Sequence, residues 1–113
     1  MLFRSEAELN CMKPTAILIN VSRGSIVDEE ALIRALQKKI IAGAGLDVFA
    51  SEPLQPENPL MLMENVTATP HCAGNTAEAR LRTQWDCLEN ILDYFDGKTP
   101  RFALNHPERR VIE

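Results

Sequence analysis

Three short apolar segments, rich in β-branched and small residues, divide the chain and predict buried strands. The first is "TAILINV" at residues 15–21, which is apolar at successive positions and therefore suits a parallel strand covered on both faces. The second is "IIAGAGLDV" at 40–48, whose glycines allow a neighbouring backbone to approach closely. The third is "NVTATP" at 65–70, which stops at a proline. A sheet of about three strands is therefore expected.

Between and after these segments the apolar positions recur with the period of a helix. Asp28 is a suitable N-cap for the first such region, which precedes the second predicted strand. Its apolar face is formed by Leu32, Ile33, Ala35 and Leu36. Residues 5–12 predict a shorter helix capped by Ser5, and residues 75–95 predict a long one that stops at Gly97.

Strand, helix, strand, loop, strand and helix follow one another, which is typical of an α/β fold with a parallel sheet and right-handed crossovers. The loop runs from about Ala50 to Met63 and contains "SEPLQPENPL", whose prolines exclude a regular helix or a central strand. Because it is longer than most connections in compact domains, it is expected to have a functional role. The tail after residue 97 is predicted to be irregular.

The composition limits the classes of function. The chain has 113 residues, enough for one domain at most, and a formal net charge of -4. Because there is no basic stripe with interleaved aromatic residues, no nucleic acid partner is expected. No apolar run approaches the roughly 20 residues of a membrane-spanning helix, so no membrane partner is expected either. Cys11, Cys72 and Cys87 form no CxxC pair, which predicts free thiols and a cytoplasmic location.

Polar residues with useful chemistry follow each predicted strand. Ser22 and Arg23 come after the first strand, Asp47 and Glu52 after the second, and His71 after the third. In open parallel sheets, ligands bind beyond the carboxyl ends of the strands, so we expect these side chains to gather at one edge. Taken singly, each has an ordinary interpretation as a solvated, turn-capping or packing residue. Their shared placement favours a site.

This set of groups suits the reduction of a 2-oxo acid. A guanidinium can bind a carboxylate in bidentate fashion and polarise the neighbouring carbonyl. An imidazole that is hydrogen-bonded to a carboxylate has a fixed tautomer and a stabilised protonated form, so it is a competent proton donor. Such a reduction needs the acid to be held, a hydride to be delivered and the new alkoxide to be protonated.

Three blocks of sequence, in this order, resemble the D-isomer-specific 2-hydroxyacid dehydrogenases: "MKPTAILINVSRGSIVDEEALIRAL", "IAGAGLDVFASEP" and "NVTATPHCAGNT". The likeness covers about residues 8–97 and implies half of a Rossmann-like doubly wound parallel sheet with a long C-terminal helix. It implies that Arg23 binds the substrate carboxylate and carbonyl, that His71 is the general acid/base and that Glu52 orients it. It also implies NAD or NADP as cofactor, with Asp47 on the nicotinamide carboxamide. The residues expected to line the nicotinamide pocket are Val21, Ser22, Arg23, His71, Ala73 and Gly74.

The chain also departs from the pattern of that family. No GxGxxG turn precedes Lys13, and neither the ribose-reading residue nor the substrate domain is present. We therefore expect residues 1–74 to be the C-terminal half of a dinucleotide-binding domain. Residues 75–113 would be the connecting helix and the tail that return to the absent substrate domain. Cys72 stands where the family commonly has an aliphatic residue or a serine, and we interpret it as a small packing residue.

Three functional hypotheses remain open. The first is a fragment of an oxidoreductase that transfers hydride between NAD(P)H and a 2-oxo or 2-hydroxy acid, and that is inactive alone. The second is a non-enzymatic corepressor of the C-terminal binding protein type, which shares the fold and the Arg, Glu and His pattern, although "CAGNT" is closer to the metabolic enzymes. The third is a naturally short chain that acts as a dimerisation or regulatory fragment. Separately, the open edge of a truncated sheet predicts self-association, and a homo-dimer is expected.

Overall fold

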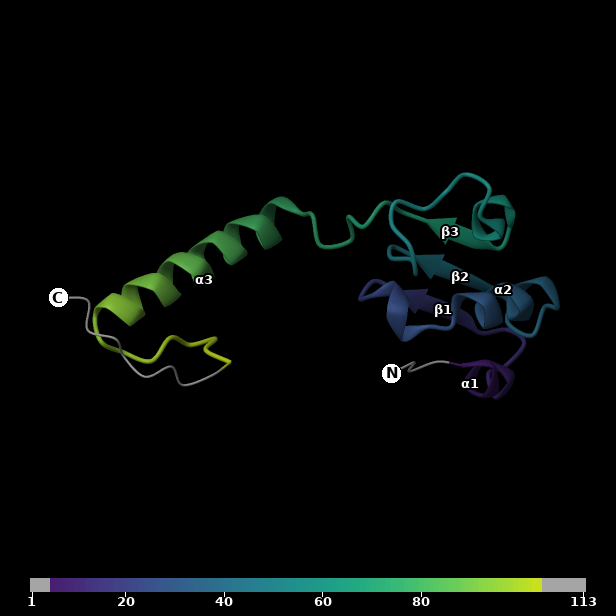
Figure 1. Ribbon diagram of the computed structural model, residues 1–113, viewed down its shortest axis with the longest axis horizontal. Helices are drawn as coiled ribbons and strands as arrows, with labels where there is room; N and C mark the ends of the chain where they lie inside the picture. The colour runs from purple at the N-terminus through teal and green to yellow at the C-terminus, as the bar shows by residue number, and fades with distance from the viewer. Residues whose placement is uncertain (1–4, 105–113) are drawn as a thin grey trace. The chain divides into compact units, whose positions relative to one another are not determined.

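The computed structural model describes residues 5–104. The chain divides into two compact units, residues 1–74 and 75–113. The first unit contains a small sheet with its helices, and the second contains one long helix (Figure 1). All the candidate site residues belong to the first unit.

The sheet has three parallel strands in the order β1–β2–β3. They are β1 (Ile17–Asn20), β2 (Gly43–Leu46) and β3 (Val66–Ala68). All three arrows point the same way in Figure 1, so the carboxyl ends of the strands share one edge. This confirms the predicted α/β class and the parallel sheet.

The helices of the first unit cover one face of this sheet. They are α1 (Glu6–Asn10) and α2 (Glu29–Gln37), and short 3₁₀ turns lie at η1 (Gly24–Ile26) and η2 (Pro59–Leu62). Asp28 Oδ1 accepts a hydrogen bond from the Ala31 amide at 3.0 Å, which confirms the predicted N-cap of α2. The buried core joins both helices to the strands through Leu9, Leu18, Ala31, Leu32, Ala35, Leu36, Ala44, Leu46 and Leu60.

The expectation that β1 is covered on both faces is wrong for this unit. Side chains alternate along a strand, and Leu18 and Asn20 point into the core. Ile17 and Ile19 point the other way and are 64% and 66% exposed. Within residues 5–74, the helices lie on one side only, so the second face of β1 has no cover there.

The glycines of β2 serve the close approach that the sequence predicted. A Cβ on Gly43 would lie 2.7 Å from the carbonyl oxygen of Asn65, which leads into β3. A Cβ on Gly45 would lie 2.8 Å from Cδ1 of Ile19 on β1. Gly43 therefore allows the close backbone approach, whereas Gly45 leaves room for the end of the Ile19 side chain.

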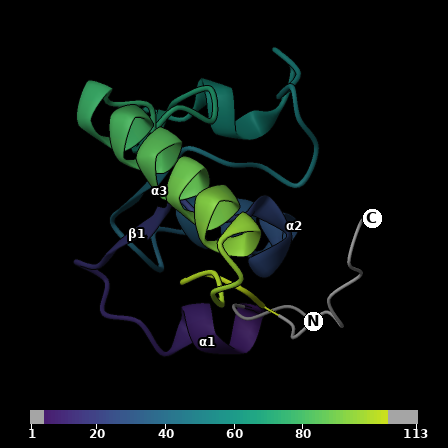
Figure 2. The same ribbon diagram turned by 90° about the vertical axis from the view of Figure 1, so that its left-hand side faces the viewer.

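The second unit is built on α3 (Ala77–Phe95), a continuous helix seen from two directions in Figure 1 and Figure 2. The Thr76 hydroxyl accepts from the Ala79 amide at 3.1 Å and begins the helix, and Gly97 with φ of 80° follows its end. The large apolar side chains along the helix are exposed, namely Leu81, Trp85, Leu88, Ile91, Leu92 and Phe95. Residues 98–104 form neither helix nor strand, as expected, and the rest of the predicted irregular tail lies outside the described residues. None of the helices in the described range could cross a bilayer.

Candidate active site

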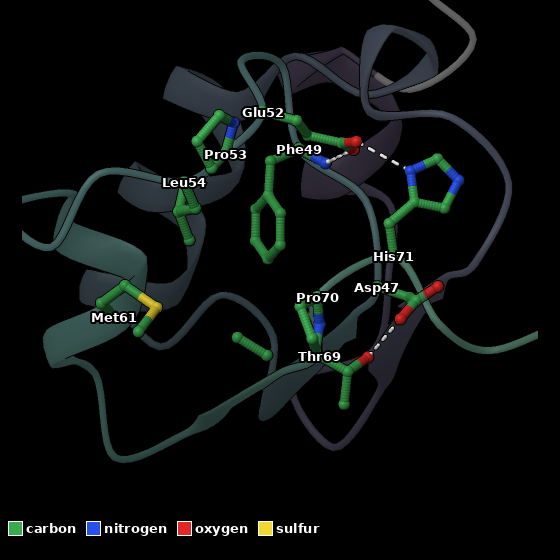
Figure 3. A pocket seen from close by; sticks show the side chains of 10 residues that line it. Asp47, Phe49, Glu52, Pro53, Leu54, Met61, Thr69, Pro70 and His71 are labelled. Carbon is green, nitrogen blue, oxygen red and sulfur yellow. Dashed lines mark hydrogen bonds and ion pairs between the residues drawn. The ribbon is translucent and has the colours of Figure 1, made fainter. Parts of the chain in front are cut away.

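Glu52 and His71 form a hydrogen-bonded pair at the carboxyl edge of the sheet (Figure 3). Oε2 of Glu52 lies 2.7 Å from Nδ1 of His71. The other carboxylate oxygen, Oε1, accepts a hydrogen bond from the Phe49 amide at 3.0 Å. Both hydrogen bonds lower the pKa of Glu52 below its ordinary value of 4.5, and the bond with His71 has the larger effect. The carboxylate is thus anchored to the backbone and directed at the imidazole.

His71 adopts a conformation that few residues with a side chain adopt. Its φ is 53°, in the left-handed region. Its amide donates to the Asp47 carbonyl at 2.9 Å and to the Thr69 carbonyl at 3.1 Å. The turn after β3 is therefore fixed to the end of β2, which is what brings the imidazole beside the loop that carries Glu52.

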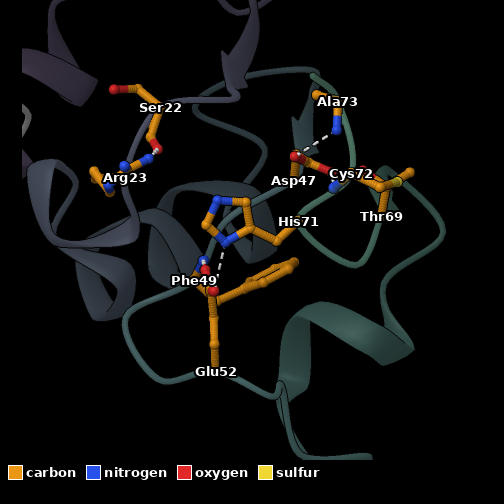
Figure 4. Close-up of polar contacts among 9 residues, drawn as sticks. All are labelled: Ser22, Arg23, Asp47, Phe49, Glu52, Thr69, His71, Cys72 and Ala73. Atoms are coloured by element: carbon orange, nitrogen blue, oxygen red, sulfur yellow. Dashed lines mark hydrogen bonds and ion pairs between the residues drawn. The ribbon is translucent and has the colours of Figure 1, made fainter. Parts of the chain in front are cut away.

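Asp47 is buried, with 2% of its surface exposed, and its carboxylate is bound by the turn around His71 (Figure 4). Oδ1 accepts from the Thr69 hydroxyl at 2.5 Å and from the Cys72 amide at 2.8 Å, and Oδ2 accepts from the Ala73 amide at 2.9 Å. The hydrogen bond from Thr69, followed by that from Ala73, lowers the pKa of Asp47 from 3.8 to about 2. The carboxylate is therefore charged throughout the physiological pH range.

The interpretation of Cys72 as a packing residue is wrong. Its side chain is exposed, and its contribution to the site is the backbone amide that binds Asp47. The side chain projects outward because the amides of residues 72 and 73 both turn toward the same buried carboxylate.

Arg23 lies on the exposed turn that follows β1. Its Nη1 donates to the Ser22 carbonyl at 2.7 Å, so the guanidinium is folded back on its own turn. Its positive charge contributes, as a smaller cause, to the lowered pKa of Glu52. The buried Asn20 shapes the turn, because its Nδ2 donates to the Arg23 carbonyl at 3.0 Å and its Oδ1 accepts from the Ser22 amide at 3.1 Å. The sequence analysis missed Asn20, although an asparagine at an inward position of an apolar strand was an available signal.

An open cleft of about 530 Å³ lies next to the Glu52–His71 pair (Figure 3). Its wall is mainly apolar, and the loop after β2 provides much of it through Pro53, Leu54 and Met61. The long loop that was expected to have a functional role therefore contributes both a charged group of the site and part of its wall.

The residues proposed to meet a nicotinamide ring are accessible. Val21 is 59% exposed, and Ser22 and Ala73 are exposed as well. A Cβ placed on Gly74 would have no atom within 4 Å, so backbone is open to a ligand there. Exposed apolar surface and open backbone at the carboxyl edge of a parallel sheet fit the nicotinamide end of a dinucleotide.

Acid unfolding should show the stabilisation that the Asp47 network gives. Because the pKa of Asp47 is about 2 when folded and 3.8 otherwise, its charged form stabilises the fold above about pH 4. This stabilisation is lost as the pH falls toward 2, and the lowered pKa of Glu52 acts in the same direction. Urea unfolding of the chain at pH 7, 4, 3 and 2 should therefore give a steep fall in the free energy of unfolding at the acid end.

Asp47→Asn should lower the free energy of unfolding at pH 7 and reduce its fall below pH 4. Glu57→Gln, at an exposed side chain, is the control and should leave the pH dependence as it is in the parent chain. An Asp47→Asn variant with the parent's pH dependence would contradict the stabilising role of this carboxylate.

Parallel strands with charged groups at their shared carboxyl edge are the arrangement of Rossmann-like dinucleotide-binding enzymes. A comparison with protein families narrows this class. Residues 3–73 match the family model described as "D-isomer specific 2-hydroxyacid dehydrogenase, NAD binding domain". The chain therefore belongs to the D-isomer-specific 2-hydroxyacid dehydrogenase family.

Individual relatives agree with this assignment. The chain is 48% identical over 108 residues to a glyoxylate reductase of Aeropyrum pernix, covering 96% of this chain and 31% of that protein. It is 48% identical over 94 residues to glyoxylate/hydroxypyruvate reductase B of Shigella boydii, covering 83% of this chain and 29% of the relative. The chain thus spans about a third of the length of these curated relatives.

Solved structures give the same fold. A glyoxylate/hydroxypyruvate reductase from Sinorhizobium meliloti, solved in complex with citrate, is similar with a TM-score of 0.81 and 40% identity, covering 94% of this chain and 34% of that one. A D-isomer specific 2-hydroxyacid dehydrogenase from Xanthobacter autotrophicus, solved with NADPH and MES, also has a TM-score of 0.81, at 37% identity. The second match covers 91% of this chain and 42% of the other. The Rossmann-like half sheet expected from the sequence is confirmed.

Proposed function

We propose that this chain is the catalytic edge of an NAD(P)-dependent oxidoreductase that reduces small 2-oxo acids such as glyoxylate and hydroxypyruvate. The observation that carries the proposal is the 2.7 Å contact between Glu52 and His71 at the edge of the sheet that also holds Arg23. The names of the relatives, which are glyoxylate and glyoxylate/hydroxypyruvate reductases, support the substrate class. Residues outside this chain would supply the rest of the cofactor site and the opposite wall of the cleft.

The proton donor in this proposal is His71. Its Nδ1 is held by the Glu52 carboxylate, which leaves Nε2 to face the substrate and to give its proton to the carbonyl oxygen. Glu52 is fixed by the Phe49 amide, so it stabilises the protonated imidazole without having to reorient. In the reverse direction the same imidazole takes the proton from the hydroxyl group.

Arg23 is the substrate anchor. The guanidinium is exposed and is bound only to the carbonyl of its neighbour Ser22 among the contacts of the described residues, so it can exchange that bond for a substrate carboxylate. A charged bidentate contact is stronger than a bond to a neutral carbonyl, which favours the exchange.

The cofactor, when bound, supplies the hydride. We assign its nicotinamide end to the exposed edge formed by Val21, Ser22, Arg23, His71, Ala73 and Gly74. Asp47 is assigned to the carboxamide. Asp47 is 2% exposed but lines the cleft, and three of the roughly four acceptor positions of its carboxylate are used within the chain, so the assignment requires the remaining one to accept from the cofactor.

The isolated chain should not bind NADH measurably. A dinucleotide is held mainly through its pyrophosphate, by backbone amides at a glycine-rich turn and a helix N-terminus that this sequence lacks. Isothermal titration with NADH should therefore give no binding heat in the micromolar range, and the chain should show no turnover. The titration is repeated with NADPH, for which the NADPH-dependent reductase of Sinorhizobium meliloti is the positive control. Micromolar binding to the isolated chain would contradict the division of the cofactor site.

A homo-dimer belongs to the same proposal. The outer edge of β1 pairs with no strand among residues 5–104, and exposed Ile17 and Ile19 lie beside it. Free backbone donors and acceptors on such an edge favour pairing with a second copy. Light scattering of the isolated chain should give twice the monomer mass, and a strictly monomeric mass would rule out this mode of association.

The test of the proposed function uses a completed enzyme. We define this as a relative, such as the Aeropyrum pernix glyoxylate reductase, in which the segment matched by this chain is replaced by this chain. Reduction of glyoxylate, followed by the loss of NADH or NADPH absorbance, is the expected result. A folded completed enzyme without that activity would contradict the proposal.

A further inference from the structure

The imidazole of the candidate site depends on an unfavourable backbone conformation. His71 has φ of 53°, and a residue with a side chain holds such an angle only when its surroundings enforce it. Pro70 precedes it and has no amide to donate, so the restraint must come from other residues of the turn. Those restraints decide where the imidazole lies relative to Glu52.

The Asp47 carboxylate accepts hydrogen bonds from the turn on both sides of His71. On the N-terminal side it binds the Thr69 hydroxyl, and on the C-terminal side it binds the amides of Cys72 and Ala73 (Figure 4). The Asp47 backbone carbonyl also accepts a hydrogen bond from the amide of His71 itself at 2.9 Å. The turn is thus hydrogen-bonded at four points to one buried residue, Asp47.

Asp47 is in turn fixed to the sheet. Its amide donates to the Asn20 carbonyl at 3.0 Å, so it continues the pairing of β2 with β1 beyond Leu46. The residue is 2% exposed, and its backbone is hydrogen-bonded through both its amide and its carbonyl. We therefore expect the loss of a donor to shift the turn more than the carboxylate.

Thr69 is the one side-chain donor in this set, and the other donors are backbone amides. Its hydroxyl lies 2.5 Å from Oδ1 of Asp47 and is the largest cause of the lowered pKa of that carboxyl. The Thr69 amide also donates to the Leu46 carbonyl at 2.9 Å, so the residue is anchored at both its backbone and its side chain. Nothing in the proposed reaction requires a hydroxyl at this position.

We propose that Thr69 is a positioning residue for His71, acting through the buried Asp47 carboxylate to hold the left-handed turn that directs Nδ1 at Glu52. Thr69 touches neither substrate nor cofactor in this role. The effect of Thr69 on turnover rests on the proposed function, whereas its effect on the position of the His71 imidazole does not.

The test compares Thr69→Val with Thr69→Ser in the full 113-residue chain. Valine keeps the shape of the side chain and removes the hydroxyl, and serine keeps the hydroxyl. Long-range ¹H–¹⁵N correlation reports whether the His71 Nδ1 proton is held in a hydrogen bond, and amide exchange reports the bonds from Cys72 and Ala73. Thr69→Val should lose the Nδ1 proton signal and exchange both amides about tenfold faster or more, because a bond to a charged group is lost. Thr69→Ser should match the parent chain.

The Nδ1 signal separates positioning from general stability. A residue that only stabilises the fold would lower the melting temperature of Thr69→Val and leave the imidazole signal of the folded molecules unchanged, and that result would overturn the proposal. Glu52→Gln defines the spectrum of an imidazole without its carboxylate. Thr69→Val should resemble it, and the double variant should show little further change.

A measurement on the parent chain covers the case in which Thr69→Val does not fold. The Thr69 hydroxyl proton should exchange slowly enough to be observed and should show a nuclear Overhauser effect to the Cys72 amide. A hydroxyl that exchanges at the free rate would overturn the proposal. None of these measurements uses turnover, so an inactive completed enzyme would count against the proposed function and leave this result standing.

If the positioning role of Thr69 and the proposed function are both correct, Thr69→Val in the completed enzyme lowers kcat and leaves the KM of the 2-oxo acid nearly unchanged. Thr69→Ser restores kcat.

Discussion

His71→Ala in the completed enzyme should lower kcat by about 10²- to 10⁴-fold and leave the Kd of NADPH nearly unchanged. The imidazole is the proposed proton donor, its Nδ1 is bound to Glu52 at 2.7 Å, and residues 5–104 contain no second histidine. In the proposed function the cofactor is held mainly by residues outside this chain, which is why its affinity should survive. Stopped-flow or steady-state NADPH oxidation measures the first quantity, and fluorescence titration with NADPH measures the second.

Two further variants test whether the loss of turnover comes from the Glu52–His71 pair. Glu52→Gln should lower kcat as well, because the neutral amide no longer stabilises the protonated imidazole. Cys72→Ala is the matched control, since its side chain is exposed and only its backbone amide takes part in the turn. It should keep kcat close to that of the parent. Unchanged turnover in His71→Ala would remove His71 from the mechanism.

Gly24→Ala should destabilise the first unit by about 3 kcal/mol or more. A Cβ on Gly24 would lie 1.9 Å from the carbonyl oxygen of Phe49 and 2.6 Å from the amide nitrogen of Ala50. Both contacts are with backbone, which cannot move aside as a flexible side chain can. The amide of Phe49 also holds Glu52, so the substitution would separate the Arg23 turn from the loop that carries the carboxylate.

Urea unfolding of the isolated chain, followed by circular dichroism, measures this effect. Gly74→Ala is the matched control, because a Cβ there meets no atom within 4 Å. Its free energy of unfolding should stay within about 0.5 kcal/mol of the parent value. A Gly24→Ala chain as stable as the parent would show that the two segments do not pack as closely as the structure indicates.

Local signals in the sequence were enough to predict the helices and strands and their order along the chain. The N-cap at Asp28 and the change from a strand pattern to a helical one placed α2, and Gly97 placed the end of α3. Because strands in alternation with helices form parallel sheets, the order also placed the candidate groups at one edge. The structure brings Glu52 and His71 together there, as the positions after two different strands suggested.

Contacts between distant segments could not be predicted in the same way. The exposure of Ile17 and Ile19 depends on which elements cover each face of the sheet, and the pattern of the strand itself does not contain that information. The bond between Thr69 and Asp47 joins positions 22 residues apart, and the left-handed angle of His71 follows from it and its neighbours. A threonine near a strand end is so common that the sequence offered no signal for this role.

The most direct test of the central claim is the configuration of the product. The completed enzyme is incubated with hydroxypyruvate and NADPH, and the glycerate formed is resolved by chiral chromatography. In the proposed site, Arg23 and His71 orient the 2-oxo acid so that one face of its carbonyl carbon receives the hydride. In a member of a D-isomer-specific family this predicts D-glycerate alone, with NADPH consumed in equal amount. L-glycerate, or a folded enzyme that forms no glycerate, would contradict the assignment of Arg23, Glu52 and His71 to this reaction.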